Sequence, residues 1–226
     1  AEATFVSGPS KTVVKRYADD LRAAVRQSGR DGEALLIYAQ ALIITGATEA
    51  EARAKHADYL RHVNIEAALV LLSGWTGVDF SRYPLDATID YIDSPAGRSA
   101  LASFSQADPD RTWTVREAAE YIGLGGRGPV LVGDARQVAD QLESWLDETG
   151  IDGFNLAFAV AHDSMADVVE HIVPELQRRG RYRTQYEQGS LRHKVFGQGP
   201  RLPASHAGRQ VSIAPSVPPC ATLAAA

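Results

Sequence analysis

The sequence contains very little sulfur, with one cysteine (Cys220) and one methionine among 226 residues. A single thiol cannot form a disulfide within the chain, which excludes a disulfide-stapled secreted domain and favours a reducing compartment. Long apolar runs are also missing: residues 34–44, interrupted by Gln40, fall short of the roughly 20 residues that cross a bilayer. No signal peptide precedes them. We therefore predict a cytoplasmic protein with no membrane partner.

No single sign of charge dominates either. The 23 Lys and Arg and 28 Asp and Glu are spread along the chain and leave a net charge of −5. Without a basic stripe, nucleic acid is not an expected partner. The six histidines lack the density of a metal site; His56 and His62, for example, are spaced wrongly to share a helix face. No metal ligands are predicted.

The chain does contain an alternation of strand-like and helix-like segments. Strands are predicted over residues 3–6, 35–44 and 153–159, with a further short apolar segment at 129–132. Amphipathic helices are predicted after Ser10, Thr48 and Asp134, and a closing helix over 164–179, kinked at Pro174. Such an alternation is typical of βαβ units on a parallel sheet.

The alternation of strand-like and helix-like segments is interrupted between residues 63 and 128. This stretch predicts short helical pieces separated by loops that contain Gly and Pro, and we interpret it as a mostly helical insertion. After Gly180 the chain is predicted to be polar and extended, and residues 204–226 a disordered tail. Residues 1–203 then form one α/β domain. Three clear strands cannot close a barrel, so we predict an incomplete (β/α)8 barrel, with a small open sheet as the alternative.

Several segments resemble one family of enzymes. They are Ala1-Glu-Ala-Thr-Phe-Val-Ser-Gly, Leu72-Ser-Gly-Trp-Thr-Gly-Val-Asp-Phe-Ser81, Gly125 to Asp140, Gly150-Ile-Asp-Gly-Phe-Asn-Leu156 and Val173 to Tyr182. In this order they resemble the bacterial-luciferase-like flavin-dependent monooxygenases, in particular the nitrilotriacetate and dibenzothiophene-sulfone monooxygenase group. The resemblance covers residues 1–203, and these segments correspond to the C-terminal portion of the family's TIM barrel.

The resemblance implies a two-component reaction. Members of the family take reduced FMN from a separate flavin reductase and use it with O₂ to oxygenate a small organic substrate. Their flavin-phosphate loop and the early strands that contact the flavin would lie before Ala1. The start at Ala1, without Met, is interpreted as a cut, and the fragment alone is expected to bind flavin poorly and to be inactive.

The resemblance also gives candidate site residues. Phe5 and Ser7, at the end of the first strand, are predicted to contact the flavin, and Phe5, Trp75, Arg127 and Val130 the substrate. Each has a structural alternative: Phe5 as a core aromatic, Trp75 as a plug that holds the insertion, and residues 123–128 as a plain loop. The last segment formally matches G-x-G-x-x-G, but it follows a helix and leads into a strand, which argues against a dinucleotide fingerprint.

Three functional hypotheses remain open. The first is the C-terminal part of a reduced-FMN-dependent monooxygenase. The second is a non-catalytic remnant, or a chain that is active only with a missing N-terminal half. The third is a barrel oxidoreductase that uses deazaflavin. Because unpaired strand edges favour association, a homo-oligomer is expected.

Overall fold

The computed structural model describes residues 1–90, 98–109, 111–204, 206–209 and 211. The chain divides into two compact units, Ala1–Tyr182 and Arg183–Ala226. Most of the expected disordered tail, including Cys220, lies outside the described residues. No helix in the described ranges is long and apolar enough to cross a membrane.

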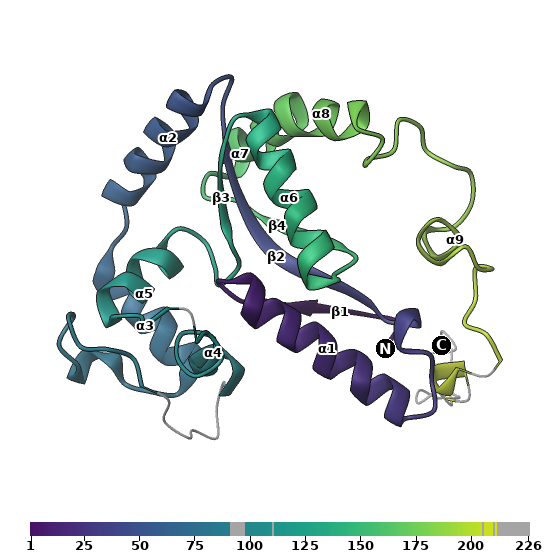
Figure 1. Ribbon diagram of the computed structural model, residues 1–226, viewed down its shortest axis with the longest axis horizontal. Helices are drawn as coiled ribbons and strands as arrows, with labels where there is room; N and C mark the ends of the chain where they lie inside the picture. Colours follow the sequence, from purple (N-terminus) through teal and green to yellow (C-terminus); the bar gives the residue numbers. More distant parts are fainter. Residues whose placement is uncertain (91–97, 110, 205, 210, 212–226) are drawn as a thin grey trace, which may run out of the picture. The chain divides into compact units, whose positions relative to one another are not determined.

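The first unit is built on a parallel sheet. Its strands are β1 (Ala3–Val6), β2 (Leu36–Thr45), β3 (Val130–Gly133) and β4 (Gly153–Ala157). β2 is central and pairs in parallel with each of the other three strands (Figure 1). The prediction of a parallel α/β protein is confirmed. The last strand is shorter than expected, since it ends at Ala157 rather than at residue 159.

Alternation along β2 shows which strands share an edge. Leu36 N–H donates to Glu2 O, and Leu42 N–H donates to Pro129 O. Both donors are even-numbered, and adjacent residues of a strand direct their polar groups to opposite edges. β1 and β3 therefore occupy the same edge of β2, one after the other. β4 pairs with the opposite edge, where the N–H of Asp152, just before β4, donates to Ile37 O. This brings the carboxyl end of β1 next to the start of β3.

One face of the sheet forms the main core. Ile37, Ala39, Ala41 and Ile43 of β2 are buried and contribute to it, with side chains of α1 (Lys11–Gln27) and α6 (Ala135–Thr149). The side chains that point to the other face are Tyr38 and Gln40 in the first half of the strand, and Leu42 and Ile44 in the second half. β2 is therefore continuously apolar only toward its carboxyl end. Both helices begin at predicted residues: Ser10 accepts from Val13 N–H, and Asp134 forms a capping box with Gln137.

The segment between β2 and β3 is helical and has a core of its own. It contains α2 (Glu49–Arg61), α3 (Ile65–Thr76), a 3-10 turn (Phe80–Arg82), α4 (Arg98–Ala102) and α5 (Val115–Gly123). Buried side chains from α3, α5 and the intervening loops form this second core, in which Phe104, Trp113 and Tyr121 pack edge to face. The second core joins α3 and α5, while α2 packs directly on β2 and β3.

The closing helical rod differs from the prediction. It begins at Ala161 rather than at residue 164, and runs as α7 (Ala161–Asp167), a π-helical turn (Val168–Ile172) and α8 (Val173–Arg178). Within the π turn Val173 N–H donates to Val168 O. Pro174 has no N–H, and its ring would clash with the carbonyl of residue 170 in a regular helix. A widened turn before the proline relieves that clash.

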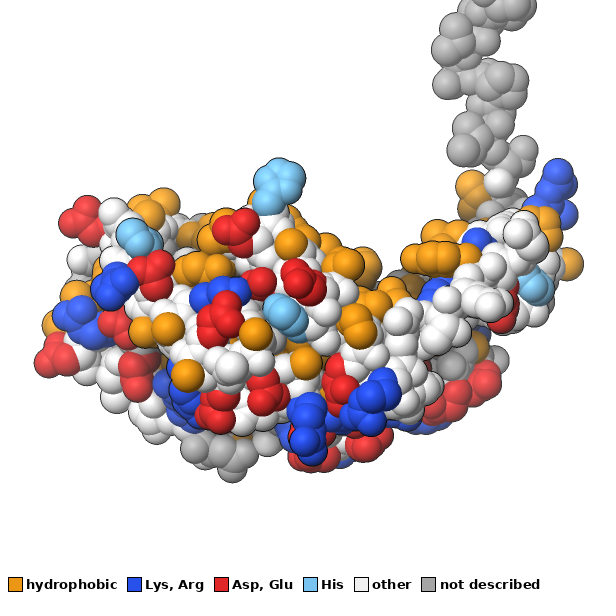
Figure 2. Space-filling view, turned by 90° about the horizontal axis from the view of Figure 1, so that it is seen from above, with side chains coloured by type: hydrophobic (Ala, Val, Ile, Leu, Met, Phe, Trp, Pro, Cys, Tyr) orange, Lys and Arg blue, Asp and Glu red, His pale blue; other side chains and the backbone are white. Residues whose placement is uncertain are grey.

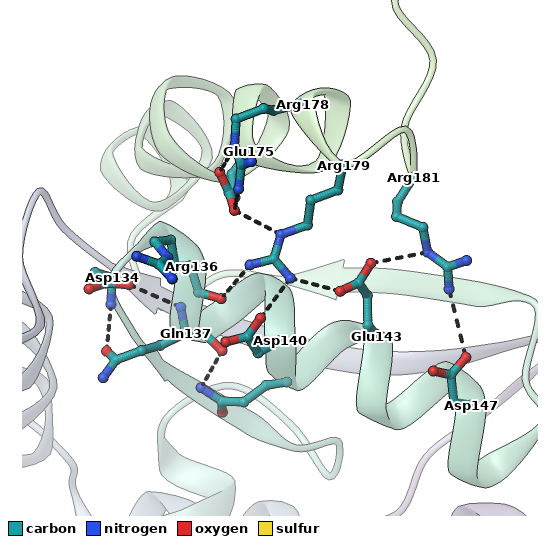
Figure 3. A network of polar contacts seen from close by, with 11 residues as sticks. Asp134, Arg136, Gln137, Asp140, Glu143, Asp147, Glu175, Arg178, Arg179 and Arg181 are labelled. Carbon is teal, nitrogen blue, oxygen red and sulfur yellow. Dashed lines mark hydrogen bonds and ion pairs between the residues drawn. The ribbon is translucent and has the colours of Figure 1, made fainter.

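A charged network fastens α8 to α6 (Figure 3). The Arg179 guanidinium donates to Glu175 at 2.7 Å on its own helix and to Asp140 (2.6 Å) and Glu143 (2.7 Å) on α6. Arg181 adds ion pairs to Glu143 and Asp147. Arg178, Arg179 and Arg181 are therefore paired with carboxylates within the fold.

The second unit contains one short helix that the sequence reading missed. α9 (Leu191–Phe196) is capped by Ser190 and ends at Gly197 in the left-handed conformation, and a 3-10 turn follows at Ala207–Arg209. The expectation of an extended chain after Gly180 is wrong for residues 191–196. Ser and Gly at the two ends are the helix signals that a short, polar segment obscured.

Candidate functional site

The face of the sheet opposite the main core carries aromatic and polar side chains. Phe5 of β1 pairs in register with Tyr38 of β2, and their ring centroids are 6.0 Å apart. The next residue of β2 on this face is Gln40, which lies in register with Asn155 of β4. Phe5 is 68% exposed and Asn155 is exposed. In this chain Phe5 is therefore not a core aromatic.

Gln40 connects the carboxyl end of β1 to the glycine-rich loop before β3. Its Oε1 accepts from Ser7 Oγ at 3.2 Å, and its Nε2 donates to Gly125 O at 3.3 Å. A Cβ on Gly126 would overlap the Gln40 amide, and a Cβ on Gly128 would overlap the main-chain oxygen of Gln40. Glycine at both positions lets the loop lie directly on β2. This explains the glycine-rich segment without a dinucleotide.

The loop directs Arg127 toward β1. A cavity of about 460 Å³ beside β1 and α1 is lined by Arg127, Phe5, Ser7 and Tyr17, among others. The Arg127 guanidinium carbon lies 5.5 Å from the centre of the Trp75 ring. Burial lowers the pKa of Arg127 from its ordinary value, which still leaves it a cation at neutral pH. Burial likewise raises the pKa of Tyr17, and the Arg127 charge opposes that rise.

A second cavity, of about 390 Å³, opens beyond the carboxyl end of β4. Its lining includes Ala159 and Val160 after β4, Leu124 after α5, and Tyr59 and His62 near the end of α2. Val130 lies in a neighbouring apolar cluster with Leu42, Ile44 and Leu124. The structure therefore places Phe5, Ser7 and Arg127 around one cavity, with Trp75 behind Arg127, and Val130 apart from them.

Some residues of this site are ones that the sequence reading passed over. Tyr38 and Gln40 lie within the strand predicted over residues 35–44, and Tyr17 lies within the helix predicted after Ser10, but no functional role was predicted for any of the three. Gln40 carried a usable signal, because a polar residue inside a buried strand requires a partner. Within the described residues, no group of three or more His, Cys, Asp and Glu could hold a metal ion.

Fold and site together define a class. This is a parallel α/β protein whose exposed sheet face carries aromatic and polar side chains, and this surface reaches the carboxyl end of β1; proteins of this class bind ligands at the carboxyl ends of their strands. The family model for luciferase-like monooxygenases matches residues 1–153. The chain belongs to the luciferase-like monooxygenase family.

Individual relatives agree with this assignment. Dimethyl-sulfide monooxygenase of Hyphomicrobium sulfonivorans is 38% identical over 211 residues, which are 93% of this chain and 44% of that protein. Nitrilotriacetate monooxygenase component A of Aminobacter aminovorans is 29% identical over 85% of this chain and 43% of that protein. Dibenzothiophene-sulfone monooxygenase of Rhodococcus erythropolis is 30% identical over 89% of this chain and 46% of that protein. The resemblance to this group is confirmed.

A solved structure shows the same fold. The crystal structure of DmoA from Hyphomicrobium sulfonivorans superimposes with a TM-score of 0.74 at 39% identity, over 88% of this chain and 42% of that one. The chain thus spans less than half the length of the relatives that it matches.

Proposed function

We propose that this chain is the C-terminal portion of a two-component monooxygenase, which uses reduced FMN and O₂ to oxygenate a small organic substrate. A separate flavin reductase would supply the FMN, and the protein would act in the cytoplasm as a homo-oligomer. The family membership of residues 1–153 carries the proposal. In this interpretation the four-stranded sheet is an arc of a (β/α)8 barrel, with residues 63–128 as its insertion.

The exposed face of the sheet fits one side of a flavin. Phe5 offers an aromatic surface at a strand end, and Ser7 and Gln40 offer hydrogen-bonding groups beside it. A planar flavin ring is typically bound by apolar or aromatic surface against its face and by hydrogen bonds at its edge. Phe5 and Ser7 are therefore our proposed flavin contacts. FMN when bound supplies the oxygen chemistry. The residues of this chain would position the ring, hold the substrate and exclude water.

The substrate would lie between the sheet and the helical segment. Arg127, held by its glycines, reaches the cavity that Phe5 lines, and Trp75 supports Arg127 from the helical side. Val130 would contribute apolar surface near the second cavity. The names of the relatives include a sulfide, a sulfone and an aminopolycarboxylate. We accordingly propose a small organic molecule without specifying its skeleton.

Oxygen uptake tests the proposal. The full-length protein, mixed with a flavin reductase, NADH and FMN, should consume O₂ and form an oxygenated product from one of a panel of small sulfides, sulfones and aminopolycarboxylates. Phe5→Ala should lower product yield per O₂ consumed, because a misplaced flavin wastes oxygen. Absence of product from every member of the panel, with folded full-length protein, would count against the enzyme and favour a non-catalytic remnant.

A further inference from the structure

Arg127 is held in place by the backbone on both sides. Gly126 and Gly128 lie against Gln40 so closely that neither position has room for a Cβ. Tyr121 Oη donates to Gly128 O at 2.7 Å and holds the loop from the helical side. These contacts fix the main chain on both sides of Arg127, and its side chain leaves the loop on the side of the cavity.

The guanidinium is partly buried but has no anionic partner. Within the described parts of the chain the Arg127 side chain forms neither a hydrogen bond nor an ion pair, and its one close ring contact is with Trp75. Two other half-buried arginines are neutralised: Arg22 by Asp152 and Glu33, and Arg179 by three carboxylates. Because five N–H donors and a charge are costly to bury unpaired, this exception calls for an external partner.

The cavity around Arg127 suits an anion with an apolar body. Ser7, Tyr17 and Ser99 contribute polar groups to the lining, and Phe5 and Leu21 contribute apolar ones. Tyr17 Oη donates to Ser99 O at 3.0 Å, so its position is fixed. One acid, Asp20, also lines the cavity, but it is exposed on α1 and forms no ion pair with Arg127. The charge of Arg127 therefore remains available.

We infer that Arg127 is an anion-recognition residue, which binds a carboxylate, sulfonate or phosphate of the ligand in a bidentate manner while its other face rests on Trp75. A planar guanidinium presents paired donors that match two oxygens of such a group. The anion has two possible sources, an acidic substrate or the phosphate of the flavin. Assignment to either rests on the proposed function, whereas the anion site itself does not.

Pairs of charged and neutral probes test the inference. Benzoate is compared with benzyl alcohol, and FMN with riboflavin, at low ionic strength, with the Trp75 indole N–H signal in NMR as the readout. We expect at least one anion of the two pairs to bind more tightly than its neutral counterpart. Arg127→Gln should remove that preference, with a loss of affinity of about tenfold or more for the anion alone.

Control variants separate this role from a structural one. Arg127→Lys keeps the charge but not the paired donors, and should retain part of the preference. Arg82→Gln removes an arginine whose side chain is 81% exposed, and should leave every affinity unchanged. Circular dichroism confirms that each variant is folded.

The outcomes are distinct. A preference only for FMN over riboflavin identifies the flavin phosphate as the anion, and a preference only for benzoate identifies an acidic substrate. If neither anion is preferred, or if Arg127→Gln weakens charged and neutral probes equally, the inference is overturned. None of these measurements needs turnover, so a failure of the monooxygenase assay leaves them interpretable.

Discussion

At the scale of single residues, the site depends on the close contact between the glycine-rich loop before β3 and Gln40 of β2. A methyl group at residue 128 would meet the main-chain oxygen of Gln40, an atom within β2 that cannot move aside alone. Gly128→Ala should therefore lower the free energy of unfolding by about 1–3 kcal/mol through overpacking. Urea unfolding followed by circular dichroism measures this change.

Gly74 is the matched control for that substitution. It lies within α3, and a Cβ there would meet nothing within 4 Å. Gly74→Ala should raise the free energy of unfolding by about 0.5–1 kcal/mol, because alanine loses less conformational entropy in a helix. Equal effects of the two substitutions would mean that the loop does not lie on β2 as described.

Residue-level prediction from sequence succeeded where the signal was local. The caps at Ser10, Thr48 and Asp134 are confirmed, because a cap depends on residues three positions apart. Gln40 and Tyr17 were missed for the opposite reason. Their partners lie far along the chain, and nothing near them in the sequence indicates Ser7, Gly125 or Arg127.

At the scale of elements, Glu175 pairs with Arg179, the arginine that joins α8 to α6, and this pair should make the stability of the protein depend on pH. The neighbouring Arg178 and Arg179 guanidiniums hold the pKa of the Glu175 carboxyl at about 2, below its ordinary 4.5. The folded state therefore binds fewer protons than the unfolded state in this range. The contribution of Glu175 to stability is present above pH 4.5 and is lost as the pH falls toward 2.

Glu175→Gln tests this coupling. The variant should be less stable at pH 7, and its stability should fall less steeply than that of the wild type between pH 4.5 and 2. Chemical unfolding at several pH values provides the two curves. Glu170 is exposed on the preceding π-helical turn and forms no ion pair among the described residues, so Glu170→Gln should leave the wild-type slope intact. Identical slopes for wild type and Glu175→Gln would show that the network in Figure 3 contributes little.

Elements themselves followed from the sequence wherever their periodicity was regular. The strands at 3–6 and 36–45 and the helices after Ser10 and Asp134 match their predictions within a residue or so. The exceptions have local causes. Pro174 widened a helix into a π turn, and the short polar α9 lacked the apolar stripe that identifies longer helices.

At the scale of the whole molecule, hydrophobic and charged side chains are finely mixed on the face shown in Figure 2, without a broad area of one charge. This agrees with the even distribution of charge along the sequence. The sequence alone could not reveal that β1 and β3 share one edge of β2. That arrangement depends on hydrogen bonds between residues far apart in the chain, such as Leu42 and Pro129, which no local pattern encodes.

The proposed barrel makes one further prediction about open edges. In the described residues β1 pairs only with β2, and by the alternation that directs Glu2 O to Leu36 N–H, the N–H groups of Ala3 and Phe5 point to the other edge. In a closed barrel that edge would pair with a preceding strand, because eight strands are needed to close the barrel. In the chain alone the Phe5 amide should therefore exchange its hydrogen rapidly.

Adding the missing strands should change that exchange. The chain is mixed with the part of dimethyl-sulfide monooxygenase that it does not match, which is more than half of that protein. We expect a one-to-one complex in which the Phe5 amide becomes protected and FMN binds more tightly than to the chain alone, because paired edges and a completed site form together. The Thr4 amide faces β2 and should be protected throughout. If the Phe5 amide is already protected in a monomeric chain, the edge is closed in another way and the sheet is a self-contained one rather than an arc of a barrel.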